Sequence, residues 1–394
     1  MDSNKTNSNL PRLRFPEFEG EWEVKTLGEV ASKVNRRNRD LEVSRILTNS
    51  ATEGVIDQEE YFDRSIAVKE NTDNYHIVEL DDFVYNPRIS ASAPVGPISI
   101  NKIDRGIMSP LYTIFKFHSG HIPFYEQYFK TNIWHPYLKS IANFGARFDR
   151  MNITTEGFFN MPLLLPSLAE QKKIASCLSE MDETISLQER KVEALKIHKQ
   201  GLMQQLFPQN GESIPRLRFS GFTGEWEEKL FSDVCNTVTP PLKLQSRDYQ
   251  KEGEYPIVDQ SQDLICGWTD DESGVISDNP VIIFGDHTCV LKYIDFPFVQ
   301  GADGVKILKT LEGNWPLFVY QSFLANPVNP DGYKRHFSDL KEKSFMFPKT
   351  LSEQKIIADC LATLDSIIVA ESSKDEELKV YKKGLMQQLF PNSK

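Results

Sequence analysis

Gly201-Leu-Met-Gln-Gln-Leu-Phe-Pro208 closes the first half of this 394-residue chain, and the same eight residues return letter for letter as Gly384–Pro391. The helical spacing of apolar residues that leads into this stretch is also found twice. Repeats of roughly 20–50 residues indicate a solenoid, whereas a repeat of about half a chain indicates two duplicated domains. The closing stretch therefore predicts a chain built from two equivalent halves.

The two halves also open alike. Pro11-Arg-Leu-Arg-Phe15 and Gly20-Glu-Trp-Glu23 return as Pro215-Arg-Leu-Arg-Phe219 and Gly224-Glu-Trp-Glu227. The long segments between the opening and closing stretches differ, and the second is the shorter one. A copied frame around uncopied contents indicates two structurally equivalent domains that recognise two different things.

The copied frame is predicted to be a pair of long helices, 166–207 and 349–391, which begin after Pro166 and Pro348. Ser167 with Glu170, and Thr350 with Glu353, have the spacing of capping boxes. Each helix would be roughly 60 Å long. A heptad-like apolar stripe gives ten positions predicted to pair the helices: Ile174, Leu178, Met181, Ile185, Leu195, Ile357, Leu361, Leu364, Ile368 and Leu378.

A helix of this length with one apolar stripe needs a partner, and the other copy is the obvious one. The pattern alone allows parallel or antiparallel pairing. Because the link after Pro208 leads into the second variable segment and not into the second helix, antiparallel helices related by a pseudo-two-fold repeat are favoured. The alternative is two unrelated helices inside ordinary cores.

The variable segments, 15–165 and 219–348, carry short β-type runs broken by Gly, Pro and Asn. Phe124–Lys139 and Trp315–Leu324 are the helices predicted within them. The fold class is therefore α+β, with two mixed, strand-rich domains joined by two long helices. A tail at 1–14, a linker at 208–218 and a tail at 392–394 complete the domain organisation.

The formal net charge is −11, which argues against a surface that is basic throughout. The five cysteines form no CxxC pair, which suits a reducing cytoplasm, and no metal site is expected. No apolar run is long enough to span a membrane. The polar first residues lack the apolar core of a signal peptide.

Local basic clusters and polar loops provide the candidates for contact with nucleic acid, although a single basic cluster is more often a solvated face. The first variable segment has its candidates in a basic run, a Pro-rich loop and the stretch before its last strand. The second has them in several separate loops. They are Arg36, Arg37, Arg39, Arg88, Ser90, Arg147, Arg150, Lys243, Arg247, Gln260, Gln262, His287, Lys334 and Arg335.

These motifs together resemble the specificity subunits of type I DNA restriction–modification systems, over nearly the whole chain. The resemblance rests on the Arg14–Trp22 opening, on Pro166–Ala175 with its second copy Leu351–Ala358, and on the closing stretch. The second opening departs slightly, with Ser220-Gly221 where the first has Pro16-Glu17.

The resemblance implies two target-recognition domains, each reading one half of a bipartite sequence in double-stranded DNA. It implies helices that set the spacer and dock two methyltransferase subunits, with restriction subunits as further partners. It also implies that S-adenosylmethionine, and ATP with magnesium, bind to those partners and not to this chain.

The chain is not expected to be the catalyst. Asn86-Pro87-Arg88 departs at its third residue from the Asn-Pro-Pro-aromatic motif of amino-methyltransferases, and no Gly-Lys dipeptide offers a P-loop. No convergent set of nucleophile, base and orienting residue is evident. The alternative function is a coiled-coil assembly scaffold that binds only protein, which the acidic charge favours.

Overall fold

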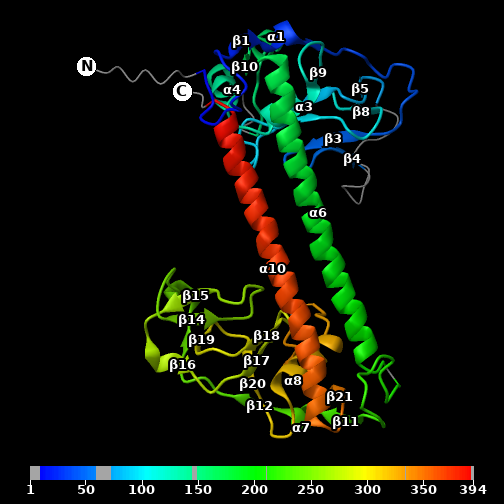
Figure 1. Ribbon diagram of the computed structural model, residues 1–394, viewed down its shortest axis with the longest axis vertical. Helices are drawn as coiled ribbons and strands as arrows, with labels where there is room; N and C mark the ends of the chain where they lie inside the picture. The colour runs from blue at the N-terminus through cyan, green and yellow to red at the C-terminus, as the bar shows by residue number, and fades with distance from the viewer. Residues whose placement is uncertain (1–8, 59–71, 144–148, 210, 333, 392–394) are drawn as a thin grey trace. The chain divides into compact units, whose positions relative to one another are not determined.

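The computed structural model describes residues 9–58, 72–143, 149–209, 211–332 and 334–391 (Figure 1). The chain divides into two compact units: unit 1 is Met1–Leu187 with Asp375–Lys394, and unit 2 is Gln188–Lys374. The two long helices, α6 (Leu168–Leu206) and α10 (Leu351–Leu389), each have 39 residues and each contribute to both units. Every unit therefore contains one strand-rich domain and part of both long helices.

Unit 1 is organised around a four-stranded antiparallel sheet of order β2-β9-β6-β7. Three two-stranded ribbons, β1-β10, β3-β4 and β5-β8, surround it. The bounds are β1 (Glu23–Thr26), α1 (Leu27–Val30), β2 (Ala31–Lys33), β3 (Leu47–Ser50), β4 (Gly54–Asp57), β5 (His76–Val78), β6 (Phe83–Tyr85), β7 (Ile98–Ile100), β8 (Gly106–Met108), β9 (Thr113–Phe117), α3 (Ile122–Phe129), α4 (His135–Ile141), α5 (Thr155–Phe159) and β10 (Pro162–Leu165).

Unit 2 repeats the ribbon and the four-stranded sheet as β11-β21 and β12-β20-β17-β18, and adds a five-stranded sheet in which β13 and β14 both run parallel to β19. The bounds are β11 (Glu227–Leu230), α7 (Phe231–Val234), β12 (Cys235–Val238), β13 (Lys243–Leu244), η2 (Ser246–Asp248), β14 (Tyr255–Val258), β15 (Gly267–Thr269), η3 (Glu272–Gly274), β16 (Val275–Ile276), β17 (Val281–Gly285), β18 (Leu291–Ile294), β19 (Phe298–Gly301), β20 (Val305–Thr310), α8 (Pro316–Ala325), α9 (Phe337–Lys341) and β21 (Ser344–Phe347).

A buried carboxylate fastens the opening stretch to the first turn of α6. Glu170 is 1% exposed, and its two oxygens accept hydrogen bonds of 2.8 Å from Nε and Nη2 of Arg14. Trp22 Nε1 donates to the same carboxylate at 3.3 Å. Ser167 Oγ accepts from the Glu170 amide, as the capping box predicts. In a capping box the Glu170 carboxylate would also accept from a first-turn amide, and this expectation is wrong, because the carboxylate binds Arg14 and Trp22.

The same fastening is built again in unit 2. Glu353 accepts from Arg218 at 2.7 and 3.0 Å and from Trp226 at 3.3 Å. Thr350 Oγ1 accepts from the Glu353 amide at 3.4 Å. The capping-box expectation therefore fails for this carboxylate in the same way. The matching geometry shows that the repeated sequence motifs form the same structure in both units.

The closing stretch packs under the opening tryptophan in each unit. Phe390 lies edge-on to Trp22 with ring centroids 6.4 Å apart, and Phe207 lies edge-on to Trp226 at 6.1 Å. A backbone hydrogen bond also joins the opening stretch to the closing stretch in unit 1, where Leu13 N donates to Gln388 O at 3.0 Å. In unit 2 Leu217 N donates to Gln205 O at 2.9 Å. The end of α10 thus closes unit 1 as the end of α6 closes unit 2.

The long helices pair antiparallel within each unit. In unit 1 Lys382, near the end of α10, forms an ion pair with Asp182, near the start of α6. In unit 2 Lys199, near the end of α6, forms the equivalent pair with Asp365, near the start of α10, at 2.5 Å. Gln188 adds a hydrogen bond of 2.7 Å to Glu371. The antiparallel expectation is confirmed.

The ten predicted pairing positions differ in their surroundings. Ile174 and Leu178 are buried in the core of the unit 1 domain, together with Leu389. Ile357 and Leu361 are buried in the core of the unit 2 domain, together with Leu206. The first turns of each helix thus use their apolar stripe against a strand-rich domain as well as a helix. The remaining six are half-buried: Met181, Ile185, Leu195, Leu364, Ile368 and Leu378.

One predicted helix is wrong in extent. The segment 124–139 forms two short helices, α3 and α4, because Pro136 suits the first turn of a new helix and not a helix interior. Trp315–Leu324 corresponds well to α8. None of the helices in the described ranges is both long and apolar enough to cross a membrane.

We predict that Glu170→Ala lowers the free energy of unfolding by about 3 kcal/mol, because the mostly buried Arg14 guanidinium loses its charge partner and the Trp22 indole loses its acceptor. Glu170→Gln should cost less, since its amide oxygen still accepts from Trp22. Denaturant unfolding measures the free energy. Hydrogen exchange should show the lost protection in unit 1 for Glu170→Ala and in unit 2 for Glu353→Ala. Glu180→Ala, on an exposed position of α6, is the matched control. Equal stabilities of the Glu170 and Glu180 variants would contradict the prediction.

Candidate nucleic-acid interface

The structure brings two candidate arginines of unit 1 together. Arg88 and Arg150 face each other in an antiparallel bridge between two loops. Backbone hydrogen bonds on either side, Met151 N to Pro87 O at 2.9 Å and Ile89 N to Asp149 O at 3.0 Å, hold that bridge. Arg88 is exposed and Arg150 is half-buried, 3.7 Å from Asp149. Arg147 lies outside the described residues.

The loop that carries Arg88 and Ser90 is held by short-range contacts. Ser90 Oγ accepts from Ala93 N at 3.1 Å. Gly96 has φ +77°, and a Cβ there would lie 2.0 Å from the Asn86 carbonyl oxygen, so only glycine fits this close turn. Asn86 Nδ2 donates to Asn49 O at 3.0 Å. An exposed arginine is thus presented from a preorganised loop.

The other candidates of unit 1 are partly engaged inside the domain. Arg36 forms an ion pair with the buried Asp82, and Arg37 Nη1 donates to Asn74 O at 2.9 Å. Burial raises the pKa of Asp82, while Arg36 acts in the opposite direction. Arg39 is exposed. Of these three, Arg39 is the one best placed to reach a ligand.

In unit 2 four separate candidate segments meet. Gln260 Oε1 accepts from His287 N at 3.3 Å, and His287 Nδ1 lies 3.1 Å from Lys334 O. Gln260 Nε2 donates to Asp303 O at 3.2 Å, and Lys243 Nζ lies 3.8 Å from the Asp303 carboxylate. We call Lys243, Gln260, His287 and Lys334 the reader cluster.

Three further candidates lie beside the reader cluster or away from it. Arg335 follows Lys334 in the chain and points its guanidinium at Asp286, 4.0 Å away. Gln262 is exposed two residues after Gln260. Arg247 is highly exposed and lies 3.7 Å from its neighbour Asp248.

A buried lysine that is not among the predicted candidates holds the loop of Gln260 and Gln262. Lys292 Nζ donates to the carbonyl oxygens of Asp259 and Asp263, at 2.8 and 2.5 Å, and is 4% exposed. Burial lowers the pKa of this ammonium. A lone lysine inside the apolar run of β18 was the signal that could have identified it, because a buried lysine needs several acceptors.

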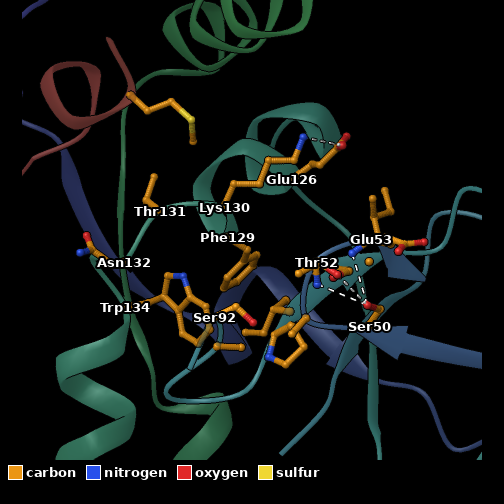
Figure 2. Close-up of a pocket in the computed structure, with 18 of the residues that line it drawn as sticks. Ser50, Thr52, Glu53, Ser92, Glu126, Phe129, Lys130, Thr131, Asn132 and Trp134 are labelled. Atoms are coloured by element: carbon orange, nitrogen blue, oxygen red, sulfur yellow. Dashed lines mark hydrogen bonds and ion pairs between the residues drawn. The ribbon is translucent and has the colours of Figure 1, made fainter. Parts of the chain in front are cut away.

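Unit 1 also contains a groove of about 890 Å³, lined by its strand-rich domain and by both long helices (Figure 2). Phe129 and Trp134 give it an aromatic surface, and Lys130, paired with Glu126 at 3.3 Å, lies above them. Lys379, Lys382 and Lys383 line it from α10. Its lining therefore combines apolar and cationic character.

Within the described residues no group of three His, Cys, Asp or Glu side chains is placed to hold a metal ion. The chemistry offered by the loops is hydrogen bonding: guanidinium and ammonium donors, amides that donate and accept, and one imidazole. These groups match the donors and acceptors on base edges and phosphates.

Comparison with known proteins identifies the fold and the family. Over 97% of this chain and 99% of the other, the structure matches the crystal structure of a type I restriction–modification S subunit from M. genitalium, with a TM-score of 0.62 and 15% identity. A structure described as the basis of complex assembly and conformational transition of the type I R-M system matches with a TM-score of 0.56 at 16% identity, over 95% of this chain and 98% of the other.

The relatives that are similar in sequence include two specificity subunits. A putative type I restriction enzyme MjaX specificity subunit of Methanocaldococcus jannaschii is 26% identical over 285 residues, or 64% of this chain and 63% of the relative. A type I restriction enzyme specificity subunit of Escherichia coli is 24% identical over 150 residues, or 36% of this chain and 37% of the relative. The matches thus span less than two thirds of either relative.

The family model for the type I restriction modification DNA specificity domain matches twice, at residues 19–196 and 223–380, once in each half of the repeat. These two matches cover most of the chain and fall on both strand-rich domains and both long helices. The chain therefore belongs to the family of type I restriction modification DNA specificity domains.

Proposed function

We propose that this chain is the sequence-specific DNA-recognition subunit of a type I restriction–modification complex, in which each strand-rich domain reads one half of a bipartite target. One observation carries the proposal. The same frame, with its buried carboxylate, tryptophan and closing phenylalanine, is built twice around domains whose loops differ. Equivalent placement of different loops suits the reading of two different half-sites.

The long helices are proposed to set the unread spacer between the half-sites. Both are continuous over 39 residues, or roughly 60 Å at 1.5 Å per residue. That length exceeds one turn of B-form DNA, which is about 34–36 Å. Their ion pairs, Asp182–Lys382 and Asp365–Lys199, fix the helix register in each unit.

Two methyltransferase subunits are the proposed partners, and exposed apolar residues on the long helices support this. Ile197 is 61% exposed and Val380, its counterpart in the second copy, is 69% exposed. Leu168 and Leu351 form a second pair of exposed counterparts. Equivalent apolar positions on both copies suit two molecules of one partner.

Catalysis is assigned to other subunits. We propose that S-adenosylmethionine binds to the methyltransferase subunits, that ATP with magnesium serves the restriction subunits, and that this chain is not an enzyme. The runner-up, a scaffold that binds only protein, finds support in the charge of −11. It does not account for the loops that present Arg88 and the reader cluster.

Exchange of residues 27–161 for the equivalent segment of a relative should change one half of the methylated sequence. This segment leaves β1, β10 and the Glu170 hydrogen bonds in place. The relative should supply an aromatic residue equivalent to Phe124, which packs against Trp22 and Phe390 of the frame. Methylome sequencing of the exchange strain is the measurement. Exchange of 231–343 is the matched experiment for the other half. A change in both halves, or in neither, after a single exchange would rule out two independent readers.

Alanine at Arg88 or Gln260 should reduce discrimination between the cognate duplex and single-base variants, each in its own half-site. A bidentate contact to a base contributes about 1–3 kcal/mol of discrimination, whereas a phosphate contact weakens binding to all sequences alike. Fluorescence anisotropy with the assembled complex measures the affinity for each duplex and hence the discrimination between them. Arg216→Ala, in the linker, is the control. If both alanine variants discriminate between duplexes as well as the wild type does, these residues do not read bases.

Ile197→Glu and Val380→Glu should each remove one methyltransferase subunit from the complex. The double variant should bind neither subunit. A charge in the centre of an apolar contact is desolvated without a partner, which is costly. Native mass spectrometry counts the bound subunits. Leu80→Glu introduces the same charge at an exposed leucine away from the long helices. Full assembly of the double variant would place the docking surface elsewhere.

A further inference from the structure

Unit 2 has a shallow concavity beside the reader cluster in which three cationic side chains converge. Lys306 projects into it from β20, Arg335 from the segment before α9, and Lys341 from the end of α9. Asp286 and Glu342 are the carboxylates that also line it. The concavity is therefore net cationic on a chain whose net charge is −11.

The carboxylate at its base is largely committed to the fold. Asp286 is 2% exposed, and its Oδ1 accepts from Phe337 N at 2.9 Å. Its Oδ2 lies 3.9 Å from Lys306 Nζ and 4.0 Å from Arg335 Nε, longer than a strong ion pair. Asp286 thus positions two cations without saturating their hydrogen-bond donors.

The third cation, Lys341, lies on an aromatic ring and not on a carboxylate. Its Nζ is 4.9 Å from the centre of the Phe337 ring, and Lys306 Nζ is 5.4 Å from the same centre. No carboxylate within the described residues forms an ion pair with Lys341. Two ammonium groups share one ring as a platform, and both retain donors for an external anion.

The concavity and the reader cluster are built from neighbouring residues of three segments. Asp286 lines the concavity and its neighbour His287 belongs to the reader cluster. Likewise, Arg335 lines the concavity and its neighbour Lys334 belongs to the cluster. Lys306 follows closely after Gly304, whose carbonyl accepts from Asp286 N at 2.6 Å. A ligand lying over the reader cluster would therefore extend directly to the three cations.

We propose that Lys306, Arg335 and Lys341 form a clamp for the DNA backbone, which holds phosphates of the second half-site while the reader cluster faces the bases. This inference rests on the proposed function, because it assigns the phosphate contacts of the same interface. Lysine and arginine donors are the usual partners of phosphate oxygens, and such contacts fix the register of a protein on the duplex without reading its sequence.

The test is a salt titration of DNA binding with Lys306→Gln, Lys341→Gln and their double variant, assembled with the methyltransferase. The probes are a cognate duplex and single-base variants in each half-site. The slope of log affinity against log salt should fall by about one for each phosphate contact removed. Affinity should fall by a similar factor for cognate and variant duplexes, so discrimination stays unchanged.

Two controls keep the result interpretable. Lys349→Gln removes the same charge from an exposed position of unit 2 outside the concavity and should leave the slope unchanged. Lys306→Arg with Lys341→Arg should keep the wild-type slope, because the charge remains.

Two results would overturn the clamp. One is a salt slope of the double glutamine variant that equals the wild-type slope. This holds also if that variant loses its methyltransferase while the slope is unchanged, because the lysines would then serve assembly and not DNA binding. The other is a loss of discrimination confined to second-half variants, which would make these lysines base readers. Failure of the proposed function is separate, since the wild-type complex would then show no sequence preference at any salt concentration.

Discussion

One buried carboxylate at the first turn of each long helix holds the frame together. Glu170 and Glu353 are almost completely inaccessible, and each is satisfied by one arginine and one tryptophan from an opening stretch more than a hundred residues away in sequence. A buried charge is tolerated only when it is paired and hydrogen-bonded. Neither the arginine, the tryptophan nor the carboxylate can therefore change alone.

This constraint explains why the frame is copied and its contents are not. The tryptophan fixed by the carboxylate packs against the closing phenylalanine, Phe390 in unit 1 and Phe207 in unit 2. The opening stretch, helix start and helix end are thus interdependent. The exposed Arg88 side chain and the hydrogen bonds of Gln260 and His287 involve none of the frame's carboxylates or tryptophans among the interactions described above, so these side chains can vary more freely than the frame.

Net charge is a poor guide to the surface of this protein. The chain is acidic, yet cations gather at the concavity of Lys306, Arg335 and Lys341 and along the groove of unit 1. Some carboxylates have a structural role, since Glu170, Asp182 and Asp365 each pair with a cation of the frame. Local arrangement, and not the total, decides what such a surface can bind.

The sequence predicted those features that depend on periodicity and repetition. The long helices follow from the apolar stripe and the copied ends, their antiparallel pairing from the link after Pro208, and the α+β class from the β-type runs between them. The role of Glu170 could not be predicted, because capping-box spacing is also satisfied when the carboxylate turns toward Arg14. The break between α3 and α4 was foreseeable from Pro136 and was missed.

The candidate site was predictable only in part, because it depends on contacts between loops. Arg88 lies opposite Arg150 through an isolated backbone bridge, and Gln260, His287 and Lys334 meet through hydrogen bonds between loops, which no local sequence pattern predicts. Lys306 and Lys341 carry no motif, and only the fold places both on the ring of Phe337. The domain boundaries, and the assignment of individual residues to bases or phosphates, stay predictions.

We propose that one chain reads two different sequences from two equivalent frames. Methylome sequencing of a methylation-deficient host that expresses this chain with its methyltransferase subunit tests it most directly. A bipartite motif is expected, with two unlike half-sites separated by an unread spacer of constant length. A single contiguous motif, a spacer of variable length, or methylation without a motif would contradict it.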